Sequence, residues 1–555
     1  MFDFSVTERV KTLKKRLVET MPAIESARAR LYTEGYFADE SVPTVLRKAR
    51  AFAHVLENIP VAIREDELIV GAPTVGEHAC QTFPEFSYAW LEDEFDTLAT
   101  RAADPFVISE QAKSELKSAN ARWSGRTTSE RAGRYMSDAA QTAVAHNAFT
   151  VGNYFYNGVG HVCPHYDWIV NEGCAGVLAR VENERKKMRP GDGDFCRKRA
   201  LLDAMTVAYT AVGDYGRRYA AHALDLAKKE KRPQRKAELE RIASVCARVP
   251  AQGATSYYEA LQSFWFVQML LQVESSGHSI SPGRFDRYIF PFYQKDIDGQ
   301  KITQEAAQEL LDCVFLKFND LNKVRDAASA EGFAGYGLFQ NLIVGGQDES
   351  GQDVTNDLSY MCLEAAIHVQ LPQPSLSLRV WNGTPDSLLI KAASLTRTGV
   401  GLPAYFNDEV IIPALLNRGL TLAEARDYCI IGCVEPQIAG KTNGWHDAAF
   451  FNMCRPLEWV FTEGLDGGAQ VGPKTPPLSA LKTFDDFFSA YKAQMTYQVE
   501  LLANADNAVD AAHGDLCPLA FLSGMVEDCI GRGLSFENGG AVYNFTGPQG
   551  FGIAN

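Results

Sequence analysis

Residues 257–273 form the segment that most restricts how this chain can fold. Their spacing predicts a helix, and apolar side chains cover it on nearly every side. A helix without a polar face has to be surrounded by other elements, so we expect it at the centre of a large core. Its most apolar stretch, 264–271, is too short to cross a bilayer, which needs about 20 residues.

The remaining sequence predicts an α/β fold whose first half is mostly helical. Helical spacing recurs over 10–21, 41–56 and 238–249. The second half alternates between strands and helices, for example a strand over 376–380 and a helix over 386–396. No fixed-period repeat or low-complexity linker divides the chain, so we expect one large composite fold.

Composition excludes several classes of function. The 555 residues contain 54 Lys and Arg against 69 Asp and Glu, a formal net charge of −15. Such an acidic chain is a poor candidate for binding nucleic acid or an anionic membrane through bulk charge. The first residues lack a signal-peptide layout, which predicts a cytoplasmic protein. The twelve cysteines include no C-x-x-C pair, so we expect reduced thiols.

One cysteine lies in a segment with unusual chemistry. A capping box at 421–424 predicts a short helix, and the apolar residues 429–431 predict a strand. The sequence Gly-Cys-Val-Glu-Pro at 432–436 then predicts an exposed, irregular tip. Glu435 would raise the pKa of Cys433, which suits a neutral S–H that reacts by hydrogen-atom transfer better than a thiolate nucleophile. The alternative is an inert buried thiol.

Four other side chains are candidates for polar chemistry, and each has a structural alternative. His161 lies in a His-x-Cys-Pro-His segment, but no second ligand cluster accompanies it, so we expect no metal site. His278 and Ser279 lie in a turn-like segment that could be purely structural. Asp447 could instead be the N-cap of a helix over 448–451.

The segment Gly-Cys-Val-Glu-Pro-Gln at 432–437 resembles the cysteine loop of glycyl radical enzymes. Three further segments resemble the coenzyme-B12-independent glycerol and 1,2-propanediol dehydratase branch. They are GHSISPGRFD at 277–286, LPQPSLS at 371–377 and GKTNGWHDAAFFN at 440–452. The resemblance extends from Arg9 to the GGAVYNFTGPQG segment at 539–550.

The resemblance implies an α/β fold, a ten-stranded barrel made of two antiparallel half-barrels wrapped by helices, which would be incomplete in this chain. Residues 1–250 would be its mainly helical N-terminal part. Residues 251–555 would be the barrel part, with Cys433 on a finger loop inside. Missing strands would leave open sheet edges and exposed apolar surface, so the isolated chain is expected to be prone to aggregation or to need a partner.

The resemblance also implies roles in the dehydration of a small vicinal diol to an aldehyde. A thiyl radical on Cys433 would remove a hydrogen atom from C1, and Glu435 would accept the C1 hydroxyl proton. His161, as an imidazolium, would protonate the departing C2 hydroxyl. Asp447, with Glu435, would accept hydrogen bonds from the substrate hydroxyls.

His278 and Ser279 would hold the other substrate hydroxyl. Two positions depart from the pattern of relatives. Many relatives carry an acidic or amide residue where this chain has His165, and some are expected to carry Tyr where it has Phe339. Loss of that phenolic hydroxyl could shift substrate choice.

The source of the radical is the largest departure. Relatives continue to an Arg-Val-x-Gly-Tyr motif bearing the radical glycine, whereas the only Gly-Tyr pairs here are Gly35-Tyr36 and Gly335-Tyr336. We expect a split enzyme in which a small glycyl radical subunit supplies the radical in trans after a radical-SAM enzyme installs it. We also expect the protein to be an oligomer. A truncated sequence and a radical-dead relative with a binding or assembly role are the alternatives.

The substrate class also has an alternative. Hydroxyproline dehydration is the nearest one, and a carboxylate or sulfonate substrate would need a basic group in the pocket. Arg284 and Arg379 are the candidates nearby in sequence, and we interpret both as partners of internal ion pairs.

Overall fold

The computed structural model describes residues 3–554 and places the apolar helix at the centre of the protein. This helix, α12 (Tyr257–Glu274), begins where the Ser256 side chain accepts the N–H of Glu259. Every residue of α12 except Glu259 is buried, so the prediction of a central core helix is confirmed. It packs against α9 (Tyr166–Arg185) and its neighbours.

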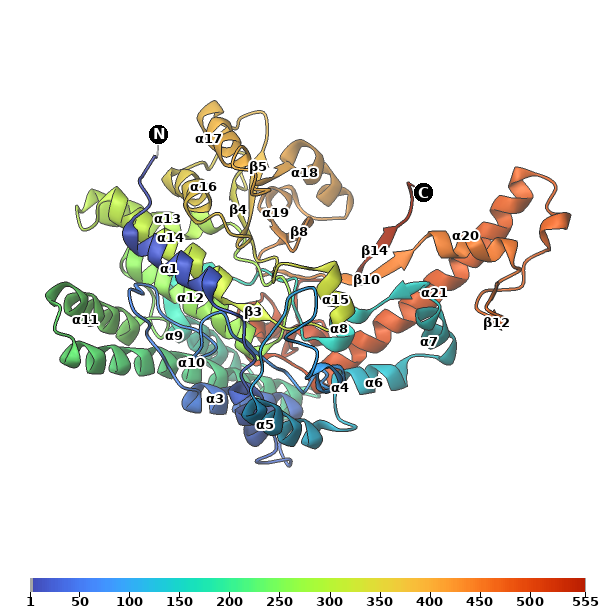
Figure 1. Ribbon diagram of the computed structural model, residues 1–555, viewed down its shortest axis with the longest axis horizontal. Helices are drawn as coiled ribbons and strands as arrows, with labels where there is room; N and C mark the ends of the chain where they lie inside the picture. Colours follow the sequence, from blue (N-terminus) through green and yellow to red (C-terminus); the bar gives the residue numbers. More distant parts are fainter. Residues whose placement is uncertain (1–2, 555) are drawn as a thin grey trace.

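Helices dominate the chain as far as Arg248. The predicted helices over 10–21, 41–56 and 238–249 correspond to α1, α3 and α11, with ends shifted by a few residues. The long helices α10 and α11 lie side by side (Figure 1). Besides α9, the helices of this region are α1 (Glu8–Glu19), α2 (Ala27–Tyr36), α3 (Thr44–Asn58), α4 (Ala89–Glu94), α5 (Glu110–Asn120), α6 (Thr128–Tyr135), α7 (Asp138–Ala145), α8 (Gly152–Tyr156), α10 (Phe195–Lys229) and α11 (Pro233–Arg248).

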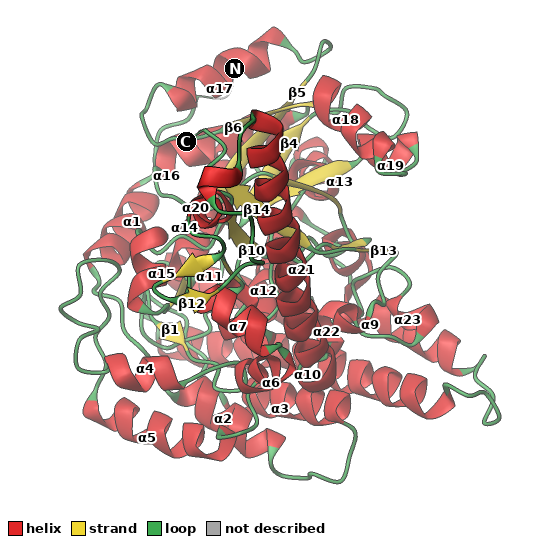
Figure 2. Cartoon of the chain, turned by 90° about the vertical axis from the view of Figure 1, so that its right-hand side faces the viewer, coloured by secondary structure: helices red, strands yellow, loops and turns green. Residues whose placement is uncertain are grey.

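A parallel sheet of three strands organises the second half. Its order is β4-β5-β6, and the crossovers between these strands carry α16 (Asp357–Val369) and α17 (Asp386–Thr396). These helices lie beside the sheet in Figures 1 and 2. The strands are β4 (Asn341–Gly345), β5 (Ser375–Val380) and β6 (Ala404–Asn407). The predicted α/β class is confirmed, and within residues 3–554 the strands close no barrel, as expected for an incomplete one.

The predicted cysteine segment is an antiparallel hairpin of β7 (Tyr428–Ile431) and β8 (Glu435–Ile438). Every residue of β7 is buried, in a small apolar cluster that is separate from the main core. The capping box at the start of α19 (Leu422–Arg426) is present as predicted. The irregular tip is shorter than predicted, because Glu435 and Pro436 belong to β8 and only residues 432–434 form the turn.

Residues 448–451 lie in a strand, which excludes the alternative that Asp447 is the N-cap of a helix there. β10 (His446–Asn452) pairs with β2 (Phe149–Thr150) on one side and with β14 (Gly547–Phe551) on the other. Its register against β14 shifts between His446 and Phe450. Asp447 is therefore in an irregular stretch of strand, where a bulge can redirect a side chain, and it is not a helix cap.

The remaining elements complete the second half and its connections. The long helix α21 runs from top to bottom through the middle of Figure 2. The remaining helices are α13 (Phe285–Asp298), α14 (Gln304–Asp320), α15 (Ala327–Gly332), α18 (Asp408–Asn417), α20 (Cys454–Phe461), α21 (Phe484–Leu516), α22 (Ala520–Ser523), α23 (Cys529–Arg532) and the short 3-10 helices η1 (Ala121–Trp123), η2 (Leu478–Ala480) and η3 (Phe536–Asn538). The remaining strands are β1 (Cys80–Gln81), β3 (Asn322–Lys323), β9 (Thr442–Asn443), β11 (Leu465–Asp466), β12 (Ala469–Gln470) and β13 (Tyr543–Asn544).

One continuous core connects the two halves. The largest cluster of buried apolar residues extends from Val10 to Ala541 and includes α12. In the described part of the chain, no helix has the length and apolar character needed to span a membrane.

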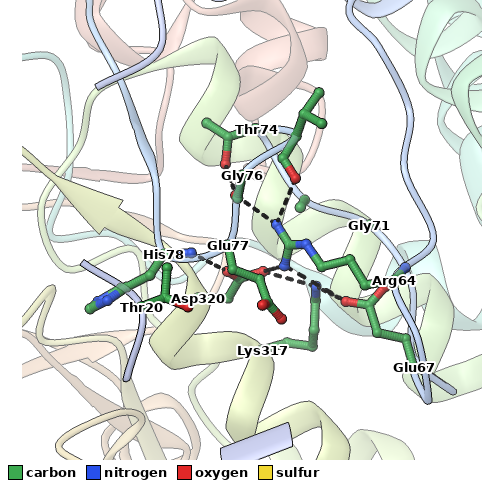
Figure 3. A network of polar contacts seen from close by, with 12 residues as sticks. Thr20, Arg64, Glu67, Gly71, Thr74, Gly76, Glu77, His78, Lys317 and Asp320 are labelled. Carbon is green, nitrogen blue, oxygen red and sulfur yellow. Dashed lines mark hydrogen bonds and ion pairs between the residues drawn. The ribbon is translucent and has the colours of Figure 1, made fainter. Parts of the chain in front are cut away.

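A buried ionic network anchors the end of α14 to the loop that precedes β1 (Figure 3). Lys317 donates to Glu67 at 2.9 Å and to Asp320 at 3.0 Å, and Arg64 donates to Asp320 at 2.5 Å. Although burial opposes ionisation, Lys317 and Arg64 hold the pKa of Asp320 below its ordinary value. Asp320 is followed by β3, so this network fixes the position of that strand.

Lys317→Met should lower the free energy of unfolding by about 3–5 kcal/mol, because it leaves two buried carboxylates with one cation fewer. Urea denaturation of the purified chain measures this loss. Lys228→Met is the matched control, since Lys228 and Asp225 form an exposed pair, and it should change stability by less than about 0.5 kcal/mol. Equal losses in the two variants would contradict a specific role of the network.

Candidate active site

The turn between β7 and β8 presents the Cys433 side chain, which is exposed. Gly432 makes this turn possible, because its φ is +59° and an added Cβ would lie 2.7 Å from Glu435 and 2.8 Å from His161. The Asn341 amide donates to the Gly432 carbonyl at 3.2 Å and holds the turn in place. The structure thus brings Cys433, Glu435 and His161 together around one glycine.

Cys433 is held as a neutral thiol. Partial desolvation, together with the carboxylates of Glu435 and Asp447, raises the pKa of Cys433 to about 12. A thiolate nucleophile needs the opposite environment. The sequence-based interpretation, that this sulfur reacts as S–H, requires a neutral thiol of this kind and stays a prediction.

Two carboxyl groups near the thiol share one hydrogen-bond donor. The amide of Gln549, on β14, donates to Glu435 Oε1 at 3.3 Å and to Asp447 Oδ1 at 3.1 Å. Burial, together with the charge of Glu435, raises the pKa of Asp447 to about 7, and burial raises that of Glu435. Near neutral pH the Asp447 carboxyl is therefore able both to give and to take a proton.

His161 is fully buried and is oriented by Tyr154. The Tyr154 hydroxyl donates to the His446 carbonyl at 2.7 Å, so it accepts the proton of His161 Nδ1, which lies 3.0 Å away. The other ring nitrogen, Nε2, is then an acceptor, 4.0 Å from Asp447 Oδ2. Burial lowers the pKa of His161 well below its ordinary value, which disfavours the imidazolium that the sequence-based role requires.

His278 and Ser279 lie on a segment that runs beside His161. The backbone N–H of His161 donates to the backbone carbonyl of His278 at 2.7 Å. This close approach depends on Gly160, where a Cβ would overlap His278. Within residues 3–554 the buried Ser279 hydroxyl has no hydrogen-bond partner. A substrate hydroxyl would satisfy it.

Several residues of the site have strained backbone conformations. Positive φ angles occur at His161 (50°), Ser279 (70°), Phe339 (50°) and Asp447 (60°). Non-glycine residues rarely adopt such angles, and they gather where the surrounding structure fixes functional side chains. The strain supports a common site for these four positions.

The two positions that depart from relatives differ in their place. Phe339 belongs to the site and packs against His278, with ring centroids 5.1 Å apart. His165 instead lies against Gly440 and stacks on Trp168. Arg284 and Arg379 form the expected internal ion pairs, with Asp427 at 2.6 Å and Asp408 at 2.8 Å respectively.

Sequence analysis missed Asn153, Tyr154, Arg325 and Gln549. Asn153 donates to Asp447 at 3.2 Å, while Arg325 donates to His278 at 3.1 Å. Gln549 lies in a segment used to recognise the family, but no local pattern gave its amide a role. All four reach the site through tertiary contacts.

The imidazoles of His161 and His278 and the carboxylate of Asp447 place potential ligand atoms within 4.8 Å of one another. These residue types can bind a divalent cation. The sequence-based expectation of no metal is untested.

Comparison with known proteins identifies the family. Residues 6–555 match the pyruvate formate lyase-like family. This chain belongs to that family. It is 57% identical to a structure described by 1,2-propanediol dehydration in Roseburia inulinivorans, covering 100% of this chain and 70% of that chain with a TM-score of 0.99.

Two further relatives agree with the motifs. The B12-independent glycerol dehydratase of Clostridium butyricum, in a glycerol-bound structure, is 52% identical, with 100% of this chain and 70% of that chain covered and a TM-score of 0.97. The (2S)-3-sulfopropanediol dehydratase of Klebsiella oxytoca is 34% identical over 100% of this chain and 68% of its own length. The predicted membership among glycyl radical lyases is confirmed.

Gly432→Ala should lower turnover about 100-fold, because the new methyl group displaces Glu435 and His161 by a few tenths of an ångström or more. The positive φ should also cost about 1–3 kcal/mol of stability. Steady-state kinetics and thermal unfolding measure the two effects. Gly531→Ala, where no described atom lies within 4 Å of the added Cβ, should change neither; full activity of Gly432→Ala would contradict this geometry.

Proposed function

We propose that this chain is the thiyl-bearing subunit of a dehydratase that converts a small vicinal diol or polyol to an aldehyde and water. The observation that carries the proposal is the neutral thiol of Cys433, exposed beside the Glu435–Asp447 carboxyl pair. The relatives that act on 1,2-propanediol and glycerol, at 57% and 52% identity, support the same substrate class.

A glycyl radical would supply the hydrogen-atom abstraction that activates Cys433. The sulfur of Cys433 then takes a hydrogen atom from C1 of the diol and returns one to the product at the end. Glu435 accepts the proton of the C1 hydroxyl, and its raised pKa makes it a stronger base than an ordinary carboxylate. The partly negative oxygen on C1 favours loss of the C2 hydroxyl.

The departing hydroxyl needs a proton, which we assign to the Asp447–His161 pair. Asp447 is protonated in a substantial fraction of molecules at pH 7, and its Oδ2 is 4.0 Å from Nε2 of His161. Asp447 gives this proton, while the neutral ring of His161 accepts a hydrogen bond at Nε2 and orients the departing group. The acid is therefore Asp447 in this proposal, whereas the sequence-based role gave the proton to His161.

The polar groups of the site suit hydroxyl groups. His278, Ser279 and the carboxyl pair offer donors and acceptors, and both Arg284 and Arg379 are occupied by their own carboxylates. Hydroxyproline dehydration stays the enzymatic alternative. A comparison of glycerol, 1,2-propanediol and trans-4-hydroxyproline as substrates separates the two.

We further propose that a separate glycyl radical polypeptide supplies the radical in trans and that a radical-SAM enzyme installs it. The chain spans 70% of the length of the two solved dehydratases. Val434, next to the thiol in sequence, is 62% exposed. A second accessible surface is the edge strand β6 of the three-stranded sheet, where Tyr405 is 46% exposed. Such surface suits contact with a second polypeptide.

Affinity capture from anaerobically grown native cells tests this source of the radical. Peptide sequencing and intact mass should show a stoichiometric small polypeptide with the Arg-Val-x-Gly-Tyr motif, and the activated complex should show a radical signal by EPR. A longer native mass would mean that the radical glycine is on the same chain. A chain of this length recovered alone would favour a radical-dead relative with a binding or assembly role.

A further inference from the structure

Arg325 makes a direct contact with the ring of His278. Its Nη2 donates to His278 Nδ1 at 3.1 Å and to the Gly337 carbonyl at 2.7 Å. A guanidinium has donors only, so Nδ1 of His278 has to be the acceptor. Both side chains are buried, at 7% and 3% exposure. A neutral His278 that accepts at Nδ1 carries its proton on Nε2.

The environment keeps His278 neutral and its ring fixed. Burial, followed by the charge of Arg325, lowers the pKa of His278 well below its ordinary value. The rings of Phe333 and Phe339 pack against it, with centroids 5.4 and 5.1 Å away. The imidazole therefore has little freedom to rotate, and its hydrogen-bond partner decides which nitrogen is protonated.

The two histidines of the site are thus held in opposite tautomers. Tyr154 leaves Nε2 of His161 as an acceptor, whereas Arg325 makes Nε2 of His278 a donor. Their ring centroids are 5.3 Å apart. One donor and one acceptor beside each other complement a hydroxyl group, which needs both.

We propose that Arg325 is a positioning residue that fixes His278 as a hydrogen-bond donor toward the substrate. The inference rests on the proposed diol dehydratase function for the identity of the substrate. Without Arg325, His278 can carry its proton on Nδ1, and the site then presents two imidazole acceptors. A substrate hydroxyl can donate to only one of them.

The fold supports this role by fixing the backbone on both sides of Arg325. Asp320, in the ionic network of Figure 3, ends α14, and β3 follows and pairs with β1. The Arg101 side chain donates to the Arg325 carbonyl at 2.7 Å. Arg101 thus holds the same loop without contacting His278, which makes it a matched structural control.

The direct test reads the tautomer in the full chain labelled with ¹⁵N-histidine. The imidazole nitrogens of the ten histidines give separate signals, and loss of one set in His278→Gln assigns His278. Wild type and Arg325→Lys should show Nε2 protonated, because lysine also only donates. Arg325→Met, or Arg325→Leu if the first does not fold, should show the Nδ1–H tautomer, because neither side chain has a donor for Nδ1. An unchanged tautomer would overturn the proposal.

Diol binding provides the functional readout. Calorimetric titration with glycerol and with 1,2-propanediol should show about tenfold weaker binding in Arg325→Met, the loss expected for one buried hydrogen bond. In the His278→Gln background the same substitution should have little further effect, because the side chain on which Arg325 acts is gone.

The controls distinguish a positioning role of Arg325 from a purely structural role. They also distinguish failure of this proposal from failure of the proposed dehydratase function. Arg101→Met should leave the tautomer and diol affinity unchanged, and an equal loss there would reduce Arg325 to a structural role. If Arg325→Met weakened binding equally with and without His278, Arg325 would contact the ligand itself and the proposal would be wrong. If no variant binds a diol, the proposed function fails, while the tautomer comparison still decides the role of Arg325.

Discussion

Replacing Cys433 by serine is expected to reduce dehydration by the activated complex to background while the fold stays intact. The side chain is exposed and lies in a turn, so the substitution removes no core packing. A serine hydroxyl cannot form the sulfur radical that the proposed reaction needs. Aldehyde formation from glycerol and 1,2-propanediol under anaerobic conditions measures the loss.

Cys196→Ser is the matched control, because Cys196 is another exposed cysteine and lies on α10. It should retain full activity. An active Cys433→Ser variant would exclude the thiyl mechanism. Slow alkylation of Cys433 by iodoacetamide at pH 8 should accompany these results, since a pKa of about 12 leaves little thiolate.

Asp447→Asn is expected to lower turnover about 10²- to 10⁴-fold, the usual contribution of a general acid or base. Asparagine keeps the size of the side chain but can neither give nor take the proton. The rate of the wild type should fall as pH rises through about 7, because the protonated carboxyl is then lost. The variant should lack this step in its pH–rate profile.

The same substitution should increase stability above pH 7. Burial raises the pKa of Asp447 to about 7 from 3.8, so between these values the folded state binds a proton that the unfolded state has released. Stability therefore falls as pH rises from about 4 to 7, and the full cost persists above 7. Removing this carboxyl should recover about 4 kcal/mol at pH 8 and none below pH 4, measured by urea denaturation.

Asp506→Asn provides the comparison for this effect. Asp506 lies on α21, and burial together with the charge of Asp510 raises its pKa to about 7 as well. The control should gain stability over the same pH range without losing turnover. Loss of activity in both variants, or no stability gain in either, would contradict the assignment of Asp447 as the acid of the site.

The sequence alone determined the features that depend on local pattern. The apolar helix over 257–273, the helix over 386–396 and the capping box at Thr421 occur as predicted, because side-chain periodicity and hydrogen bonds between near neighbours decide them. The motif around Cys433 and Glu435 also identified the family and placed the thiol beside a carboxylate.

Tertiary structure decided the chemistry of the site. Asp447 looked like a helix cap but lies in β10, because pairing with β2 and β14 overrides the local signal. Its pKa depends on burial and on Glu435, which follow only from the folded arrangement. The tautomers of His161 and His278 are set by Tyr154 and Arg325, and no spacing in the sequence reveals these hydrogen bonds between distant segments.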